Sequence, residues 1–252
     1  MPLETKSRAR MSAPAVALPP PFRLVTLREV GDAFAHAREI AAEAGAGTLV
    51  YVGRFDLAEF AVVLEPEEPL CIARRAVYAG LNALGDALVA QAPPEKPITF
   101  DWPDAVRVDG GLVGGARLAW PRGADEGEPP AWLVFGAMIR TVAMGENEPG
   151  LRPLATALAE EGFDDADSDR VLEGFARHLM TAIDTWQERG FGEIAKNYLA
   201  RLMPANGLRR DLDENGDLLV RRAGESQSER RPLRAALAKP SWLDPKTKGP
   251  RA

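Results

Sequence analysis

The stretch from Phe100 to Leu118, FDWPDAVRVDGGLVGGARL, constrains the fold of this chain more than any other. It holds strand-like runs, one ending at a Trp-Pro-Asp tripeptide and a later one interrupted by Gly114 and Gly115. Proline removes a donor from a strand ladder and glycine removes a packing side chain, so buried strands rarely contain both. We interpret the glycine pair as a place where something must approach the backbone closely. The alternative is a packed sheet with a glycine bulge and a core tryptophan.

The composition argues against several classes of function. The 252 residues carry a formal net charge of −6, which argues against a protein body that binds nucleic acid. Cys71 is the single cysteine, so no disulfide can form within the chain, and we expect a reducing, cytoplasmic location. No apolar run approaches the roughly 18–20 residues of a membrane helix. We also expect no secretory signal, because the N-terminal residues lack a continuous apolar segment.

Hydrophobic periodicity predicts an α+β fold. Helical spacing of apolar residues predicts helices over 28–44, 70–91, 151–162, 167–190 and 191–202. Short apolar runs predict strands over 48–52, 59–66, 98–101, 112–119 and 131–139. Sequential strands with helices grouped around them favour a mixed or antiparallel sheet flanked by helices, rather than a doubly wound parallel sheet.

The same pattern predicts the domain organisation. Three consecutive prolines end the first segment, and Asn215 with Gly216 forms a turn between two strands near the other end. The resulting small β unit is too short to fold alone. The predicted units are a disordered tail (1–21), a main domain (22–204), a small C-terminal β domain (205–244) and a disordered tail (245–252).

Four motifs in this order resemble the biotin and lipoate protein ligase superfamily. The family has a Lys-Trp-Pro-Asn-Asp motif, a Lys-Leu-Ala-Gly-Ile-Leu strand, a strand with Gly-x-Gly-Ile-Asn and a C-terminal Gly-Ile-Asp-x-x-Gly-x-Leu-Leu hairpin. The counterparts here are Asp101–Ala105, Gly111–Ala116, Gly136–Arg140 and residues 209–221. The resemblance spans residues 22–222 and implies the fold shared by biotin ligases and class II aminoacyl-tRNA synthetases. It does not by itself settle the function.

The resemblance implies a ligand site on the sheet. In this fold the ring and tail of the ligand lie flat across the strands, so Gly114 and Gly115 would leave room for them. Trp102 would form an apolar wall or stack on a purine, and Pro103 would fix the adjacent turn. The ligand-binding residues predicted from the motifs are Trp102, Pro103, Asp104, Gly114, Gly115 and Gly136.

The family's chemistry needs a cationic clamp that this chain largely lacks. Family members use ATP and Mg²⁺ to convert biotin or lipoate to an acyl-adenylate, then pass the acyl group to a carrier lysine. The Arg-rich loop of the family is reduced here to residues 53–58, GRFDLA, in which Asp56 has the wrong sign. Asp101 and Gly111 replace the two family lysines. At about 4 Å and an effective dielectric constant of about 20, each charge reversal changes the interaction by several kcal/mol. We therefore expect adenylation to be lost.

Three arginines could rebuild part of that clamp. Arg54 remains from the loop, Arg117 lies two residues beyond the glycine pair, and Arg140 stands where the family has Asn. An arginine can hold a carboxylate or phosphate through two parallel hydrogen bonds. The alternative for each is a solvated arginine at the end of a strand.

Other residues were weighed as functional candidates. Cys71, at the start of a helix, could accept an acyl group as in some transferases of the superfamily, but a plain helical cysteine is favoured. Asp32, Phe34 and His36 could line a pocket rim, although a surface pair of Asp32 and His36 is favoured. Residues 211–222 imitate a calcium loop, but Arg222 stands where a bidentate Glu is needed, so we expect a turn and no metal.

Three hypotheses follow. The first is a pseudo-enzyme that binds an acyl-type or cofactor-like molecule, or a carrier protein, without adenylating it. The second is an active biotin or lipoate protein ligase or acyltransferase that uses ATP and Mg²⁺ with the three arginines. The third is a structural or oligomerising protein, because family members often form homodimers through exposed sheet surfaces. The sequence assigns no catalytic residue.

Overall fold

The structure is a computed structural model that describes residues 16–144, 154–164 and 167–251. Within these ranges, no helix combines the length and apolarity that crossing a membrane requires.

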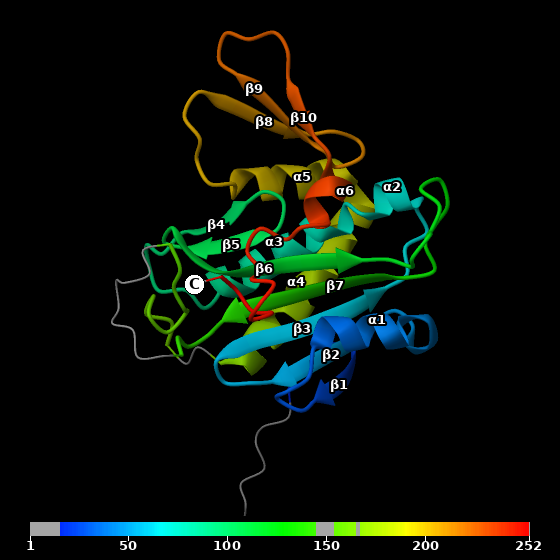
Figure 1. Ribbon diagram of the computed structural model, residues 1–252, viewed down its shortest axis with the longest axis vertical. Coiled ribbons are helices and arrows are strands. Elements are labelled where there is room, and N and C mark those ends of the chain that lie inside the picture. The colour runs from blue at the N-terminus through cyan, green and yellow to red at the C-terminus, as the bar shows by residue number, and fades with distance from the viewer. Residues whose placement is uncertain (1–15, 145–153, 165–166, 252) are drawn as a thin grey trace, which may run out of the picture.

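A seven-stranded mixed sheet forms the centre of the described chain (Figure 1). Its strands are β1 (Arg23–Leu27), β2 (Thr48–Gly53), β3 (Leu57–Leu64), β4 (Ile98–Asp101), β5 (Ala105–Val108), β6 (Gly111–Ala119) and β7 (Leu133–Arg140). They lie in the order β1-β2-β3-β7-β6-β5-β4, with β1 parallel to β2 and the other neighbours antiparallel. The predicted α+β fold with a mixed sheet is confirmed.

Helices cover both faces of this sheet. The helices are α1 (Ala33–Ala44), α2 (Leu70–Ala73), α3 (Ala76–Val89), α4 (Ser168–Arg189), α5 (Phe191–Ala200) and α6 (Leu233–Leu237). Figure 1 shows α1 in front of the sheet and α3 and α4 behind it. We call the first side the α1 face.

Alternation along each strand separates the two faces. On β3, Leu57 and Ala61 pack on the α1 face, whereas Phe60 and Val62 enter the large core under α3 and α4. This core is closely packed: Phe135 of β7 stacks on a phenylalanine of α4 with ring centres 5.5 Å apart. The larger core therefore fixes the sheet from behind, and the α1 face presents a thinner covering.

The C-terminal β unit is larger than the predicted hairpin. It contains β8 (Leu208–Leu212), β9 (Leu218–Arg222) and β10 (Glu229–Arg231) in one antiparallel sheet. Leu218 and Leu233 are buried in the main core, which ties this unit to the rest of the chain. In the turn that imitates a calcium loop, Asp213 accepts hydrogen bonds from the backbone N–H groups of Asn215 and Asp217. Asp213 therefore stabilises a turn.

Several element boundaries differ from the predictions. The first helix begins at Ala33 and not at residue 28, because Asp32 caps it by accepting from the N–H of Ala35 at 2.8 Å. Val30, which falls within the predicted range of that helix, is 95% exposed. β1 precedes this helix and was not predicted, because Arg23 and Thr26 are polar and exposed and its apolar run is short.

Three further segments differ between the prediction and the structure. The helix predicted over 70–91 is divided between α2 and α3, and β5 was missed because it has only four residues. The helix predicted over 151–162 falls partly outside the described residues. Its described part, 154–162, forms turns and a single strand bridge with Leu112.

We predict that Gly80→Ala destabilises the fold by about 1–3 kcal/mol. A Cβ on Gly80 of α3 would lie 2.3–2.6 Å from three atoms of the Phe135 ring, which is held against α4. The matched control is Gly192→Ala on α5, where nothing lies within 4 Å of the added Cβ. Helix propensity makes that control neutral or slightly stabilising. Urea unfolding measures both variants, and equal stability of the two would contradict the close helix–sheet contact.

Candidate functional site

Gly115 and Gly136, which we call the glycine floor, lie on the α1 face of the sheet. Aromatic rings of the chain itself cover both glycines. Gly136 of β7 lies under Phe34 of α1, since a Cβ at position 136 would be 2.5 Å from Cδ2 of that ring. Phe34 is buried there, in the cluster that joins α1 to β2, β3 and β7. Close docking of α1 is thus sufficient to explain glycine at this position.

A tryptophan from the end of the chain covers the second glycine. A Cβ on Gly115 would lie 2.4 Å from Cδ1 of Trp242 and 2.3 Å from the backbone oxygen of Asp104. The indole is 1% exposed, and its Nε1–H donates to the carbonyl of Ala116 at 3.0 Å. The buried residues that pack with it are Leu57, Ala105, Leu112 and Met138. An aromatic ring of the chain itself therefore covers the floor at the place predicted for a ligand.

Trp242 belongs to residues Ser241–Arg251, which we call the C-terminal strap. Figure 1 shows the strap in red, crossing in front of β6 and β7. The sequence predicted a disordered tail after Asp244, but in the structure this segment has defined hydrogen bonds. The N–H of Asp244 donates to Gly249 at 2.9 Å, and the N–H of Arg251 donates to Trp242 at 2.8 Å. Burial of the indole, which the local sequence does not reveal, holds the segment in place.

A different constraint explains the glycine at position 114. Its φ is +155°, and a Cβ there would lie 1.9 Å from the backbone oxygen of Met138 on the neighbouring strand. The adjacent register shift between β5 and β6 marks a bulge at this point. Strand pairing at the bulge requires glycine here, as in the alternative interpretation of the sequence.

Arg117 is part of a buried cluster at the start of α1. Its guanidinium lies 4.3 Å from the centre of the Phe34 ring and 3.8 Å from Oδ1 of Asp32. Glu59 accepts from the N–H of Ala33 at 2.8 Å, so two carboxylates face the helix N-terminus. Burial raises the pKa of Glu59 and lowers the pKa of Arg117. Arg117 therefore stabilises α1 against the sheet, and its Nε has no hydrogen-bond partner among the described residues.

A cavity of about 460 Å³ lies beside this cluster, between β3, β7 and the strap. Leu57, Met138 and Val142 supply apolar lining. The charged residues in its lining are Asp32, Arg54, Asp56, Glu59, Arg140 and Lys248. The structure therefore brings Arg54 and Arg140 to one cavity, while Arg117 lies in the cluster next to it.

Both cavity arginines have partners within the chain. Arg54, in the short loop between β2 and β3, donates to Asp56 through Nε at 3.0 Å and through Nη2 at 2.7 Å. This pair lowers the pKa of the Asp56 carboxyl. Arg140 donates to the carbonyl of Thr156 at 3.1 Å and to that of Pro250 in the strap at 2.8 Å.

Trp102 and Pro103 lie away from this cavity. The Nε1–H of Trp102 donates to the hydroxyl of Tyr78 at 2.9 Å, and that hydroxyl donates to the carbonyl of Gly216 at 2.6 Å. The carbonyl of Pro103 accepts from the Tyr198 hydroxyl at 3.1 Å. These contacts join the β4–β5 turn to the large core and the C-terminal β unit. The structure does not bring Trp102 together with the three arginines.

Asp104 lies beneath the strap with no exposed surface. Its Oδ1 accepts from the Ser241 hydroxyl at 3.1 Å, whereas Oδ2 has no hydrogen-bond partner in the part of the chain that the structure describes. Burial raises the pKa of this carboxyl to about 7, and the contact with Ser241 partly opposes that rise. Asp104 is thus a polar group at the edge of the covered floor.

Asp101 and Gly111, which stand where the family has lysines, have other roles in this structure. Asp101 accepts from Nε of Arg107 at 2.7 Å, which forms an ion pair across the β4–β5 hairpin. A Cβ on Gly111 would lie 2.6 Å from Cγ2 of Thr156, so that glycine admits a neighbouring segment. Neither position adds a cation to the cavity.

The remaining candidates do not form a reactive group among the described residues. Cys71 is half-buried in α2, and its backbone N–H donates to the carbonyl of Glu126. The expected pair of Asp32 and His36 does not form, because Asp32 caps the helix and Nδ1 of His36 lies 3.7 Å from Glu39. Asp32 and His36 nevertheless both line a hollow of about 350 Å³ at the start of α1, and Asp32 also lines the cavity between β3, β7 and the strap.

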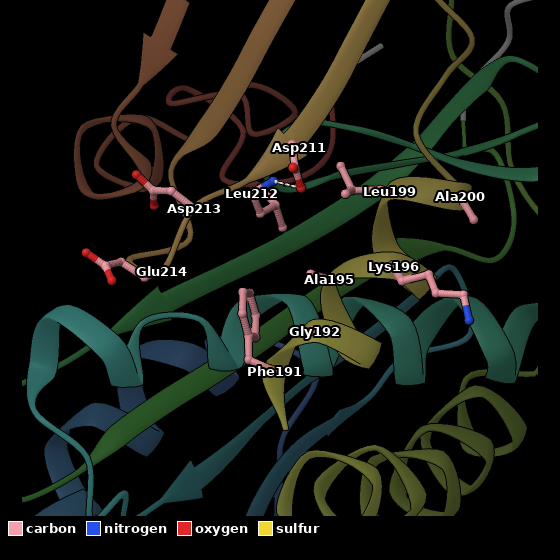
Figure 2. A pocket seen from close by; sticks show the side chains of 10 residues that line it. All are labelled: Phe191, Gly192, Ala195, Lys196, Leu199, Ala200, Asp211, Leu212, Asp213 and Glu214. Carbon is pink, nitrogen blue, oxygen red and sulfur yellow. Dashed lines mark hydrogen bonds between the residues drawn. The ribbon is translucent and has the colours of Figure 1, made fainter. Parts of the chain in front are cut away.

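A second hollow, of about 570 Å³, lies between α5 and the β8–β9 turn. Figure 2 shows Phe191 and Leu212 on its two sides, with the carboxylates of Asp213 and Glu214 at one edge. No predicted ligand-binding residue lines it, so the α1-face cavity is the candidate site.

Sequence reasoning missed three residues of this region. Trp242 lies in a segment that was assigned to the C-terminal unit, Lys248 lies in the predicted tail, and Glu59 reads as one polar residue in an apolar strand. A buried charge within such a strand is unusual, and that signal alone could have marked Glu59. The other two depend on the path of the chain.

The comparisons with known proteins agree with the fold and the motifs. Residues 18–200 match the biotin/lipoate A/B protein ligase family. This chain belongs to that family. No curated protein matches the sequence.

Solved structures of ligase-like proteins are similar to this family member. A biotin protein ligase-like protein of unknown function from Silicibacter sp. TM1040 has a TM-score of 0.76 and 29% identity, covering 89% of this chain and 100% of that chain. Biotin protein ligase from Aquifex aeolicus has a TM-score of 0.65 and 18% identity, covering 83% and 95%. Biotin protein ligase from Leishmania major, in complex with biotinyl-5-AMP, has a TM-score of 0.53 and 15% identity, covering 83% and 99%.

We predict that Asp104→Asn stabilises the family member more at pH 8 than at pH 5, by about 2 kcal/mol. The folded-state pKa of about 7 exceeds the value of about 3.9 in an unfolded chain. Wild-type stability attributable to this group is therefore present at low pH and is lost as pH rises from about 4 to about 7. Asparagine retains an acceptor for Ser241 and does not ionise.

Urea unfolding at the two pH values measures this difference. Asp164→Asn, at an exposed carboxyl, is the control. An equal gain at pH 5 and pH 8 would show that Asp104 does not titrate in this range.

Proposed function

We propose that this protein binds an acyl-type or cofactor-like small molecule on the α1 face and does not adenylate it. The observation that supports this most directly is the short loop between β2 and β3. In place of the family's Arg-rich loop it holds Arg54, which is paired by two hydrogen bonds with Asp56. The charge that would offset an acyl phosphate is balanced within the chain.

The other arginines support the same proposal. Arg117 is committed to Asp32 and the Phe34 ring, and Arg140 donates to backbone carbonyls of Thr156 and Pro250. A phosphate group would have to displace these partners before it gained a bidentate contact. Preorganised charge is what stabilises a developing phosphate transition state, so its absence lowers the expected rate.

The cavity supports ligand binding. Leu57, Met138 and Val142 offer an apolar surface for a hydrocarbon or flat ring. Arg54 is already paired with Asp56, so the cation that the lining offers to a ligand is the exposed Lys248. Binding sites of this kind combine a mostly apolar surface with a few polar groups that orient the ligand. An organic acid with an apolar body matches that arrangement.

The alternative is an active biotin or lipoate protein ligase, or an acyltransferase, with a rebuilt site. The observation in its favour is that Arg54, Arg140 and Lys248 line one cavity. Such an enzyme would bind ATP with Mg²⁺ and deliver the acyl group to a carrier protein. A solved family structure from Aquifex aeolicus is in complex with biotin and ATP. For either activity we retain the proposals of a cytoplasmic location and of a carrier protein or a second copy of this chain as partner.

We predict that pyrophosphate exchange from ATP is at least about a thousandfold lower than for the Aquifex aeolicus ligase. The reaction is measured with biotin, lipoate and octanoate in separate assays, with Mg²⁺ present. The expected loss follows from the missing cations, since one transition-state donor alone contributes about 10²–10³ in rate. Turnover above background with any of the acids would replace the binding proposal with the rebuilt-ligase alternative.

We predict that Lys248→Gln weakens octanoate binding about tenfold and leaves the unliganded melting temperature nearly unchanged. Removing one charge-assisted contact produces a loss of that size, whereas an exposed lysine contributes little to stability. Arg177→Gln, at an exposed pair on α4, is the control.

Thermal shift and calorimetry with octanoate and its neutral amide measure the effect. The amide should bind both proteins equally. If Lys248→Gln leaves octanoate binding unchanged, the carboxylate does not lie near the strap.

A further inference from the structure

The C-terminal strap is held to the body of the protein through side-chain contacts. Its backbone hydrogen bonds are mostly internal, including those from Lys248 to Asp244 and from Arg251 to Trp242. Its strand bridge, between Leu243 and Pro250, is internal too. The strap therefore forms a self-contained turn laid on the sheet and does not add a strand to it.

Side chains attach the strap to the α1 face. The indole of Trp242 packs on Gly115 and donates to the carbonyl of Ala116, and Leu243 packs against the same cluster. The Ser241 hydroxyl donates to Asp104, and Arg140 donates to strap carbonyls. Ahead of the strap, α6 is fixed by buried Leu233 and Leu237, and the chain then passes through Ala238–Pro240. A hinge in that short segment would let the strap leave as one unit while α6 stays docked.

The surface of the sheet beneath the strap has the features of a ligand site. Leu57, Leu112 and Met138 form an apolar floor around Gly115. At its edge the carbonyl of Ala116 accepts from the indole N–H, and Oδ2 of fully buried Asp104 has no hydrogen-bond partner within the described ranges. Both groups would accept a hydrogen bond from a flat ring.

Removing the strap would also enlarge the adjoining cavity. Thr247, Lys248, Gly249 and Pro250 of the strap form one wall of that cavity. Met138 belongs both to the cavity lining and to the floor under Trp242. The floor and the cavity would therefore become one continuous site.

We propose that the C-terminal strap is a displaceable plug, in which Trp242 occupies the position of a flat heterocycle that carries an N–H donor. Docking of the strap and binding of such a ligand exclude one another. The existence of a ligand rests on the proposed function, whereas the opening of the strap does not.

Hydrogen exchange of the unliganded, full-length protein tests the opening. The amides of Asp244, Lys248 and Arg251 should exchange at least tenfold faster than that of Ala116 in β6, yet at least tenfold slower than a free peptide. Equal rates for the strap and Ala116 would mean that the strap opens only by global unfolding, and the absence of protection would mean that it is not docked. Either result overturns the proposal.

Ser241→Ala tests the attachment without removing the ring. It should accelerate exchange of the strap amides and leave the exchange of Ala116 unchanged, because it removes only the bond to Asp104. Ser226→Ala, at an exposed serine, is the control. No change in strap exchange with Ser241→Ala would contradict the role assigned to this contact.

Binding of indole, used as the probe, tests the exclusion. By calorimetry, Trp242→Ala should bind indole at least tenfold more tightly than wild type, while Trp242→Phe and the distant Trp120→Ala should not. In wild type, saturating indole should accelerate exchange of the strap amides. If indole binds wild type and Trp242→Ala equally, or leaves strap exchange unchanged, the plug is overturned.

Titration of Trp242→Ala with biotin, lipoate and octanoate separates the two proposals. Failure of all three acids, alongside tight binding of indole and rapid strap exchange, would reject the proposed function and uphold the plug. Binding of an acid without any change in strap exchange would uphold the proposed function and reject the plug.

Discussion

The α1 face depends on aromatic rings packed directly on glycine backbone. Phe34 lies on Gly136 and Trp242 lies on Gly115, and in each case an added Cβ would come within 2.5 Å of the ring. The first contact sets the distance between α1 and the sheet, and the second holds the end of the chain across β6 and β7. Without these glycines neither ring could approach, because protein interiors leave no spare volume.

The docking of α1 determines how the charged side chains on this face are arranged. Asp32 and Glu59 meet the N–H groups at the start of that helix, and Arg117 offsets their charge over the Phe34 ring. One of the three candidate arginines is thereby used in folding. Arg54 has its own aspartate, so the charge balance at the candidate site is local and nearly complete. This is the physical basis for proposing binding without adenylation.

The motifs predicted the fold well and the site only in part. The order of strands and helices, and the glycines between residues 111 and 136, were sufficient for the ligase-like fold because they reflect backbone geometry. They did not predict that Trp102 would donate to Tyr78, on the opposite side from the cavity. Nor did they predict the partners of Arg140, which lie far along the chain at Thr156 and Pro250.

The sequence by itself determined the ligase-like fold, the shortened loop around Arg54 and the loss of the family lysines, since these depend on local pattern and residue type. Only the tertiary structure decided what lies on the glycine floor. That outcome depends on Trp242, which is 127 positions from Gly115 and has no periodic pattern linking it to the sheet. A long-range contact between an indole and a bare stretch of backbone is set by the path of the whole chain, and no local propensity encodes it.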